Sequence, residues 1–134
     1  MSHAGECLCG AVRYSISAEP ALVGVCHCGD CQKFTGSAFS YLVAVAEADL
    51  HIDGKLETYS KMGDSGQPIL RKFCPKCGSS ILEVAATRPG LVLLNGGTLN
   101  SPAEFTPSLQ IYCDRELSWA ELSPDIKRFP GAPE

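Results

Sequence analysis

The sequence predicts an all-β fold with little helix, and three observations support this prediction. Apolar and polar residues alternate over residues 12–16, where Val12, Tyr14 and Ile16 are separated by polar side chains, as in a half-buried strand. The other apolar runs are short, which suits strands better than helices. The 13 glycines and 9 prolines are scattered along the chain, so they separate short elements and form no linker.

The predicted strands follow one another with turns between them. In chain order they cover residues 12–16, 22–25, 37–45, 56–60, 69–74, 80–85, 91–94 and 109–113. The turn after the seventh strand is marked by Asn95 and two glycines. Helix is limited to single turns over residues 46–50 and 117–122. Residues 60–68 contain two glycines and little apolar content, and therefore predict an exposed loop.

Length and composition restrict the class of protein. A chain of 134 residues predicts a single domain over residues 1–134, and 45% hydrophobic residues predict a globular one. The net charge of −4 argues against a nucleic-acid partner. No apolar stretch approaches the roughly 20 residues that span a bilayer, so no membrane partner is expected. The first residues lack a basic region followed by an apolar one, which predicts no signal peptide and a cytoplasmic location.

Eight cysteines are the most informative feature of the composition. In the reducing cytoplasm, closely spaced cysteines bind metal more often than they form disulfides. Seven of the eight fall into three groups, which are Cys7 and Cys9; Cys26, Cys28 and Cys31; and Cys74 and Cys77. Cys113 stands alone.

The third group has the form of a zinc knuckle. Cys74 and Cys77 flank a tight turn, and Gly78 permits the backbone conformation that this turn needs. A knuckle supplies half of a tetrahedral site, and Cys7 and Cys9 are the simplest donors for the other half. The expected result is a closed, structural zinc site of four thiolates, which contributes directly to folding. A disulfide or unpaired core cysteines are the alternative.

The second group places three thiols within six residues. Cys26, Cys28 and Cys31 could reach one ion if the chain wraps around it as a loop. Three protein ligands with one open position are typical of catalytic zinc sites. Two alternatives would close the site, with either His27 or Cys113 as the fourth ligand. Cys113 could instead be a buried strand residue that packs as a small hydrophobe.

Thiolate ligands favour one kind of chemistry at an open zinc site. Because thiolates donate charge, the metal is a weak Lewis acid and poorly suited to acidifying a bound water. A soft thiol is a more suitable fourth ligand, since zinc binds it as the thiolate. This set of ligands therefore indicates addition of a small thiol to a carbonyl, or the reverse cleavage of a carbon–sulfur bond.

With its three groups in this order, the sequence resembles the glutathione-dependent formaldehyde-activating enzyme family, which also includes centromere protein V. The resemblance rests on G-x-C-x-C-G-x-V from Gly5, C-H-C-x-x-C-x-K-x-x-G-S from Cys26, and F-C-x-x-C-G-S from Phe73. It implies the all-β fold called the β-tent, built of small antiparallel sheets. It also implies a structural zinc on Cys7, Cys9, Cys74 and Cys77, and a catalytic zinc on Cys26, Cys28 and Cys31. The implied activity is that of a carbon–sulfur lyase, with glutathione and formaldehyde as substrates.

Two other functions are compatible with these residues. The first is a non-catalytic zinc module that binds a protein partner, because centromere protein V shows that the family is not purely metabolic. The second is a zinc-bearing methionine sulfoxide reductase, which shares the β-tent and carries a reactive cysteine on a late strand, where this chain has Cys113. Two departures weaken the second reading, because the first cysteine pair is C-x-C and Arg115 replaces the expected asparagine.

Overall fold

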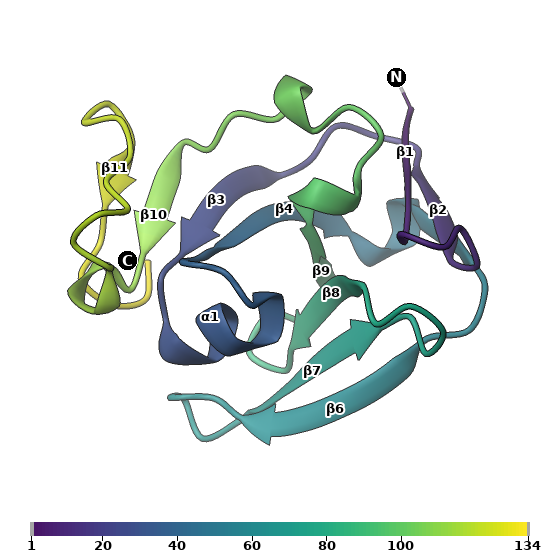
Figure 1. Cartoon of the computed structure of the whole chain (residues 1–134), viewed down its shortest axis with the longest axis horizontal. Helices are drawn as coiled ribbons and strands as arrows, with labels where there is room; N and C mark the ends of the chain where they lie inside the picture. Colours follow the sequence, from purple (N-terminus) through teal and green to yellow (C-terminus); the bar gives the residue numbers. More distant parts are fainter. Residues whose placement is uncertain (1, 134) are drawn as a thin grey trace.

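Strands dominate the structure, a computed structural model that describes residues 2–133 (Figure 1). About 40% of the residues lie in strands and 14% in helices, so the prediction of an all-β fold is confirmed. The strands form two sheets.

The smaller sheet has three antiparallel strands. They are β1 (His3–Glu6), β2 (Arg13–Ile16) and β5 (Leu50–Asp53), with β2 in the centre. The alternation that predicts β2 is seen directly, because Tyr14 and Ile16 are buried and their neighbours are exposed. Neither β1 nor β5 is predicted from the sequence, since both are short and β1 lacks an apolar face.

The larger sheet has eight strands. In spatial order they are β11 (Lys127–Arg128), β10 (Leu109–Ile111), β3 (Leu22–Cys26), β4 (Ser40–Ala46), β9 (Leu91–Asn95), β8 (Ser80–Ala85), β7 (Pro68–Phe73) and β6 (Glu57–Met62). β10 pairs in parallel with both β3 and β11, and the other pairs are antiparallel. The sheets described for residues 2–133 are therefore mostly antiparallel, as expected, and β10 differs in pairing in parallel. The parallel ladders join segments far apart in the chain, which local patterns do not reveal.

Helix is scarce, as predicted, but its main element is not where the sequence places it. The helix α1 (Gly29–Thr35) lies between β3 and β4, where a loop was expected. Four single turns of 3-10 helix are η1 (Glu47–Asp49), η2 (Gly96–Thr98), η3 (Pro102–Glu104) and η4 (Cys113–Arg115). The turn predicted over residues 46–50 is confirmed by η1, whereas the one over 117–122 is wrong. Within residues 2–133, no helix is long and apolar enough to cross a membrane.

The two faces of the larger sheet have different coverings. One face packs with the smaller sheet around a core that includes Val12, Val43, Ile81 and Leu94, each fully buried. The opposite face is covered by α1, where a smaller cluster joins Cys26, Cys31 and Leu42. Apolar burial on the first face is the main stabilising contribution to the fold. The second face is where the cysteines of the second group gather.

Candidate metal centres

Four cysteines from two distant turns meet at the junction of the two sheets. The sulfur atoms of Cys7, Cys9, Cys74 and Cys77 all lie within 4.8 Å of one another. The Cys7–Cys9 and Cys9–Cys74 sulfur separations are 3.6 and 3.9 Å. In a tetrahedral site with metal–sulfur bonds of about 2.3 Å, the sulfur atoms are about 3.8 Å apart. This donor set therefore fits a zinc ion, in the pairing that the sequence predicts.

Each turn of this four-cysteine group is closed by a glycine. Gly10 and Gly78 both have a φ of 79°, a left-handed conformation that other residues rarely adopt. Their amides donate to the carbonyls of Cys7 and Cys74, at 3.1 and 2.8 Å. In both turns a left-handed glycine follows the second cysteine, although the C-x-C motif is one residue shorter than the C-x-x-C motif.

Hydrogen-bond donors stabilise the charged form of these thiols. The Val12 amide donates to the Cys7 sulfur at 3.2 Å. The side chain and the amide of Ser79 lower the pKa of Cys77 to about 5. Donors aimed at sulfur are typical of the surroundings of a thiolate that binds metal.

The second group of cysteines is arranged by the start of a helix. Cys26 ends β3, Cys28 is the N-cap of α1, and Cys31 lies within α1. The Cys31 amide donates to the Cys28 sulfur at 3.2 Å, which satisfies one of the free amides of the first turn. The three sulfur atoms lie within 4.8 Å of one another. The predicted residues are thus brought together by a helix and not by a loop.

Negative charge concentrates on one of these three thiols. Hydrogen bonds with Cys26 and Cys31 lower the pKa of Cys28 to about 2. The Cys31 amide and the positive charge of Arg71 act in the same direction. The interaction with Cys28 in turn raises the pKa of Cys26 to about 12. A metal ion that binds this group must displace the protons that the other two thiols keep.

The structure separates this group from both residues that could have closed it. The His27 ring is fully buried and its Nε2 bonds to Oε1 of Gln110 at 2.9 Å. The Cys113 sulfur donates to the Gln110 carbonyl at 3.6 Å. Within residues 2–133, no fourth cysteine, histidine or carboxylate atom lies within 4.8 Å of all three sulfurs. The group is therefore open to an outside ligand.

The open group lies in the wall of a cavity of about 550 Å³, a size suited to a small molecule. Ile111 and Tyr112, at the end of β10, form another part of the wall. The Tyr112 backbone is left-handed, with a φ of 54°, which is unusual for a residue other than glycine. Such conformations persist at functional sites when the surrounding structure holds them.

The sequence does not predict the buried ion pair that lies beside the three cysteines. Arg71 and Glu83 face each other across β7 and β8, with Nε and Oε1 3.2 Å apart and both side chains about 6% exposed. The Cys31 sulfur lies 3.9 Å from the same Oε1. Burial raises the pKa of Glu83, while Arg71 opposes this change. The signal in the sequence is a charged residue inside each of two mainly apolar strands, Arg71 in β7, which also carries Lys72, and Glu83 in β8.

Fold and site together define an all-β protein with two cysteine groups, one closed and one open, that could each hold a metal ion. The family model described as glutathione-dependent formaldehyde-activating enzyme matches residues 2–115. The chain belongs to this family, as its motifs predict. Membership supports an enzymatic function related to glutathione and formaldehyde.

A solved structure shares this fold. The crystal structure of a Rhodobacter sphaeroides protein is similar to this chain, with a TM-score of 0.57 and 24% sequence identity. The similarity covers 72% of this chain and 87% of that protein's chain. The comparison with curated proteins gave no match.

Proposed function

We propose that this protein is a zinc-dependent carbon–sulfur lyase that acts on the adduct of a small thiol and an aldehyde, such as S-hydroxymethylglutathione. Cys26, Cys28 and Cys31 would hold the catalytic zinc. The family supports the substrates, and the thiol-rich donor set supports the metal.

One observation carries this proposal. Three sulfur atoms lie close enough to share an ion, no fourth donor within residues 2–133 completes the set, and the group faces a cavity. A closed site would need a fourth protein ligand, as the four-cysteine group has. An open site beside a cavity of this size is suited to a substrate.

The reaction requires little acid–base chemistry from the chain. Forming the adduct joins sulfur to the aldehyde carbon and moves the thiol proton to the aldehyde oxygen; cleavage reverses both changes. When bound, zinc would supply a position at which the thiol is held as thiolate. Ile111 and Tyr112 line the same cavity as the three cysteines. Arg71 supplies a buried positive charge that helps to lower the pKa of the Cys28 thiol.

A second zinc would be structural and held by Cys7, Cys9, Cys74 and Cys77. We therefore expect two zinc ions for each chain in native mass spectrometry. A folded chain that carries one zinc would contradict the two-site proposal.

The decisive variant is Cys28→Ser. Serine is a favourable N-cap, so α1 should keep its start while the group loses a sulfur ligand. In the cobalt-substituted protein, added glutathione should change the visible spectrum of the wild type and leave that of the variant unchanged. The exchange between formaldehyde, glutathione and their adduct, measured by NMR, should be faster with the wild type than with the variant. The variant also serves as the control for the uncatalysed reaction.

Cys113→Ser is the matched control, because this cysteine lies outside both groups. It should respond to glutathione as the wild type does. If glutathione leaves the wild-type spectrum unchanged, the protein is a non-catalytic metal-binding module and the proposed activity is wrong. The single domain and the cytoplasmic location stay predictions from the sequence.

A further inference from the structure

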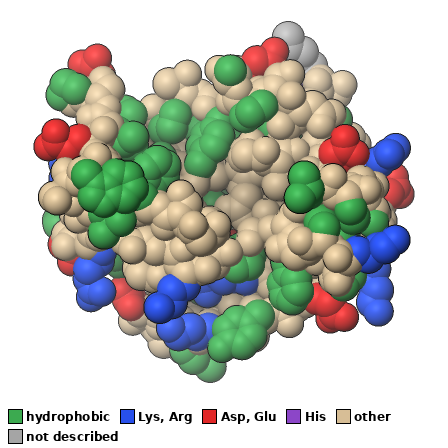
Figure 2. All heavy atoms as spheres, in the orientation of Figure 1, with side chains coloured by type: hydrophobic (Ala, Val, Ile, Leu, Met, Phe, Trp, Pro, Cys, Tyr) green, Lys and Arg blue, Asp and Glu red, His purple; other side chains and the backbone are tan. Residues whose placement is uncertain are grey.

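The strand β6 forms one edge of the larger sheet and has a single neighbour, β7. All six of its residues are exposed, so no segment within residues 2–133 covers this edge. In Figure 1, β6 lies at the lower margin of the molecule, with no other strand beyond it. Figure 2 shows charged side chains of both signs and hydrophobic side chains along the same margin. The edge is therefore free to meet another strand.

Native sheets usually protect their edges with very short strands, prolines, bulges or a covering segment. The opposite edge of the same sheet follows this rule, because β11 has only two residues. In contrast, β6 has six residues and contains no proline. It pairs with β7 in one continuous register from Glu57 to Met62. A long, regular edge of this kind is the geometry that accepts an added strand.

The hairpin that joins β6 to β7 shows which backbone groups face outward. It closes with a hydrogen bond from the Gly63 amide to the Gln67 carbonyl at 2.8 Å. Hydrogen-bonded and non-hydrogen-bonded pairs alternate along an antiparallel ladder, so the odd-numbered residues of β6 bond to β7. The N–H and C=O groups of Thr58, Ser60 and Met62 therefore point away from the sheet and can bond to a further strand.

The side chains of β6 match those of a second, antiparallel copy of the same strand. Residues whose backbone groups point outward must face each other, and one such register pairs Thr58 of each copy with Ser60 of the other. This register places Tyr59 opposite its own counterpart, and Glu57 opposite Lys61 on both sides. Opposite charges and facing aromatic rings both stabilise cross-strand pairs. The edge is therefore self-complementary, as an interface with two-fold symmetry requires.

Lys61 can join this interface without losing its present partner. Its Nζ lies 2.7 Å from Oδ1 of Asp30 on α1, and its side chain is 52% exposed. An ammonium group has three donors, so the exposed side of Lys61 can bind a second carboxylate. Tyr59 is 61% exposed, and pairing with its counterpart would remove part of this aromatic surface from water.

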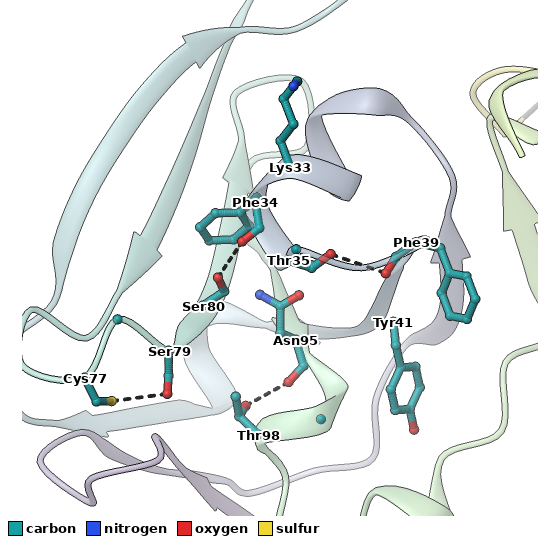
Figure 3. A pocket seen from close by; sticks show the side chains of 13 residues that line it. Lys33, Phe34, Thr35, Phe39, Tyr41, Cys77, Ser79, Ser80, Asn95 and Thr98 are labelled. Atoms are coloured by element: carbon teal, nitrogen blue, oxygen red, sulfur yellow. Dashed lines mark hydrogen bonds between the residues drawn. The ribbon is translucent and has the colours of Figure 1, made fainter. Parts of the chain in front are cut away.

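We propose that β6 pairs with β6 of a second copy of this chain, so that two larger sheets join edge to edge across a two-fold axis at Tyr59. The interface borders the cavity at the three cysteines, because Lys61 and Met62 line that cavity. It leaves another cavity untouched, one of about 610 Å³ at the end of α1, since β6 contributes none of its lining residues (Figure 3). The proposal does not depend on the lyase function.

Sedimentation equilibrium of the zinc-loaded protein should show a monomer in equilibrium with a dimer. One pair of edges buries less surface than a standard interface of about 1,600 Å², so the dimer should be weak and depend on concentration. Ser60→Pro removes an outward donor and leaves the ladder with β7 intact. It should dimerise at least about tenfold more weakly and keep the circular dichroism spectrum and zinc content of the wild type.

Two charge reversals test the register. Glu57→Lys and Lys61→Glu each turn both facing charge pairs of the dimer from attraction to repulsion, so each variant alone should associate at least about tenfold more weakly. An equimolar mixture of the two variants should associate like the wild type, since opposite charges then face each other at both pairs. Asp125→Lys is the control and should also associate like the wild type, because Asp125 precedes β11 at the opposite edge of the sheet.

A wild type that stays monomeric at its highest soluble concentration would overturn the proposal and leave the edge to a strand of a different protein. A mixture that associates no better than its two components would also overturn it, because the dimer would then use another register or surface. Failure of the lyase function is a separate result. Cys28→Ser lies outside β6 and should dimerise as the wild type does, whereas Ser60→Pro should keep the cobalt response to glutathione.

Discussion

Tyr112 holds a backbone conformation that an L-residue adopts only at a cost. Its φ of 54° lies in the left-handed region, where a Cβ meets the neighbouring carbonyl oxygen. Replacement by glycine or by alanine removes the ring in both cases, but only alanine keeps the Cβ. We expect Tyr112→Gly to be more stable than Tyr112→Ala by about 1 kcal/mol in urea denaturation. Equal stability of the two variants would show that the backbone relaxes and stores no strain.

The ion pair of Arg71 and Glu83 is costly to break. Each charge is buried, so removal of one partner leaves the other uncompensated. Arg71→Met should lower the free energy of unfolding by about 3 kcal/mol, measured on the zinc-loaded protein. The double variant Arg71→Met/Glu83→Leu should recover most of this loss. A double variant as unstable as the single one would contradict the pairwise account.

The sequence predicts which cysteines lie together better than it predicts their surroundings. The spacing of seven cysteines identifies both groups, because metal ligands must lie close together and short motifs ensure this. The partnership of Arg71 with Glu83 depends on the register of β7 and β8, which no local pattern reveals. The free edge of β6 depends on the order of the strands in the sheet, and this too needs three-dimensional structure.

At the scale of elements, α1 shows why a short helix escapes prediction. It has seven residues, too few for an amphipathic period to be recognised, and its N-cap is a cysteine in place of the usual serine, threonine or aspartate. The strands are predicted well where one face is buried, as in β2. β6 overlaps the strand predicted over residues 56–60, although all six of its residues are exposed, and it continues to Met62, into the stretch predicted as a loop.

The N-cap of α1 gives a prediction that separates capping from metal binding. Cys28→Ser and Cys28→Ala both remove a thiolate ligand, but serine can still accept a hydrogen bond from the Cys31 amide. In the metal-free protein, Cys28→Ser should be more stable than Cys28→Ala by about 1 kcal/mol. Denaturation of both variants in the presence of a chelator measures this difference. If alanine matches serine, the helix does not depend on its cap.

The contact between β1 and η2 leaves no space for a side chain at Gly5. A Cβ at this position would overlap with the Tyr14 ring and the Thr98 carbonyl. We expect Gly5→Ala to lower the free energy of unfolding by about 2 kcal/mol, since overpacked sites typically cost 1–3 kcal/mol. Gly131→Ala is the control, because no atom lies within 4 Å of the added Cβ. Similar losses in both variants would contradict the steric explanation.

At the scale of the whole molecule, the four-cysteine group joins the two sheets. Cys7 and Cys9 follow β1, and Cys74 and Cys77 follow β7, so one metal ion would tie both sheets together. The two sheets also share the apolar core, and further contacts include the bridge of Gly5 to Leu99 and the hydrogen bond of Tyr14 to Thr98. Removal of metal should therefore loosen the smaller sheet first. Hydrogen exchange in a chelator should rise in β1 and β2 before it rises in β4 and β9, and a simultaneous rise would contradict this order.

The parallel pairing of β3 with β10 has a consequence for synthesis on the ribosome. The four-cysteine group lies entirely within the first 77 residues, whereas Ile111 and Tyr112, beside the group of three cysteines, emerge much later. At roughly 5–20 residues per second, the nascent chain spends seconds with one group complete and the wall of the other still missing. During translation, the three sulfur atoms of the open group therefore emerge before the four-cysteine group is complete, and they remain without this part of their cavity wall until the last strands are made.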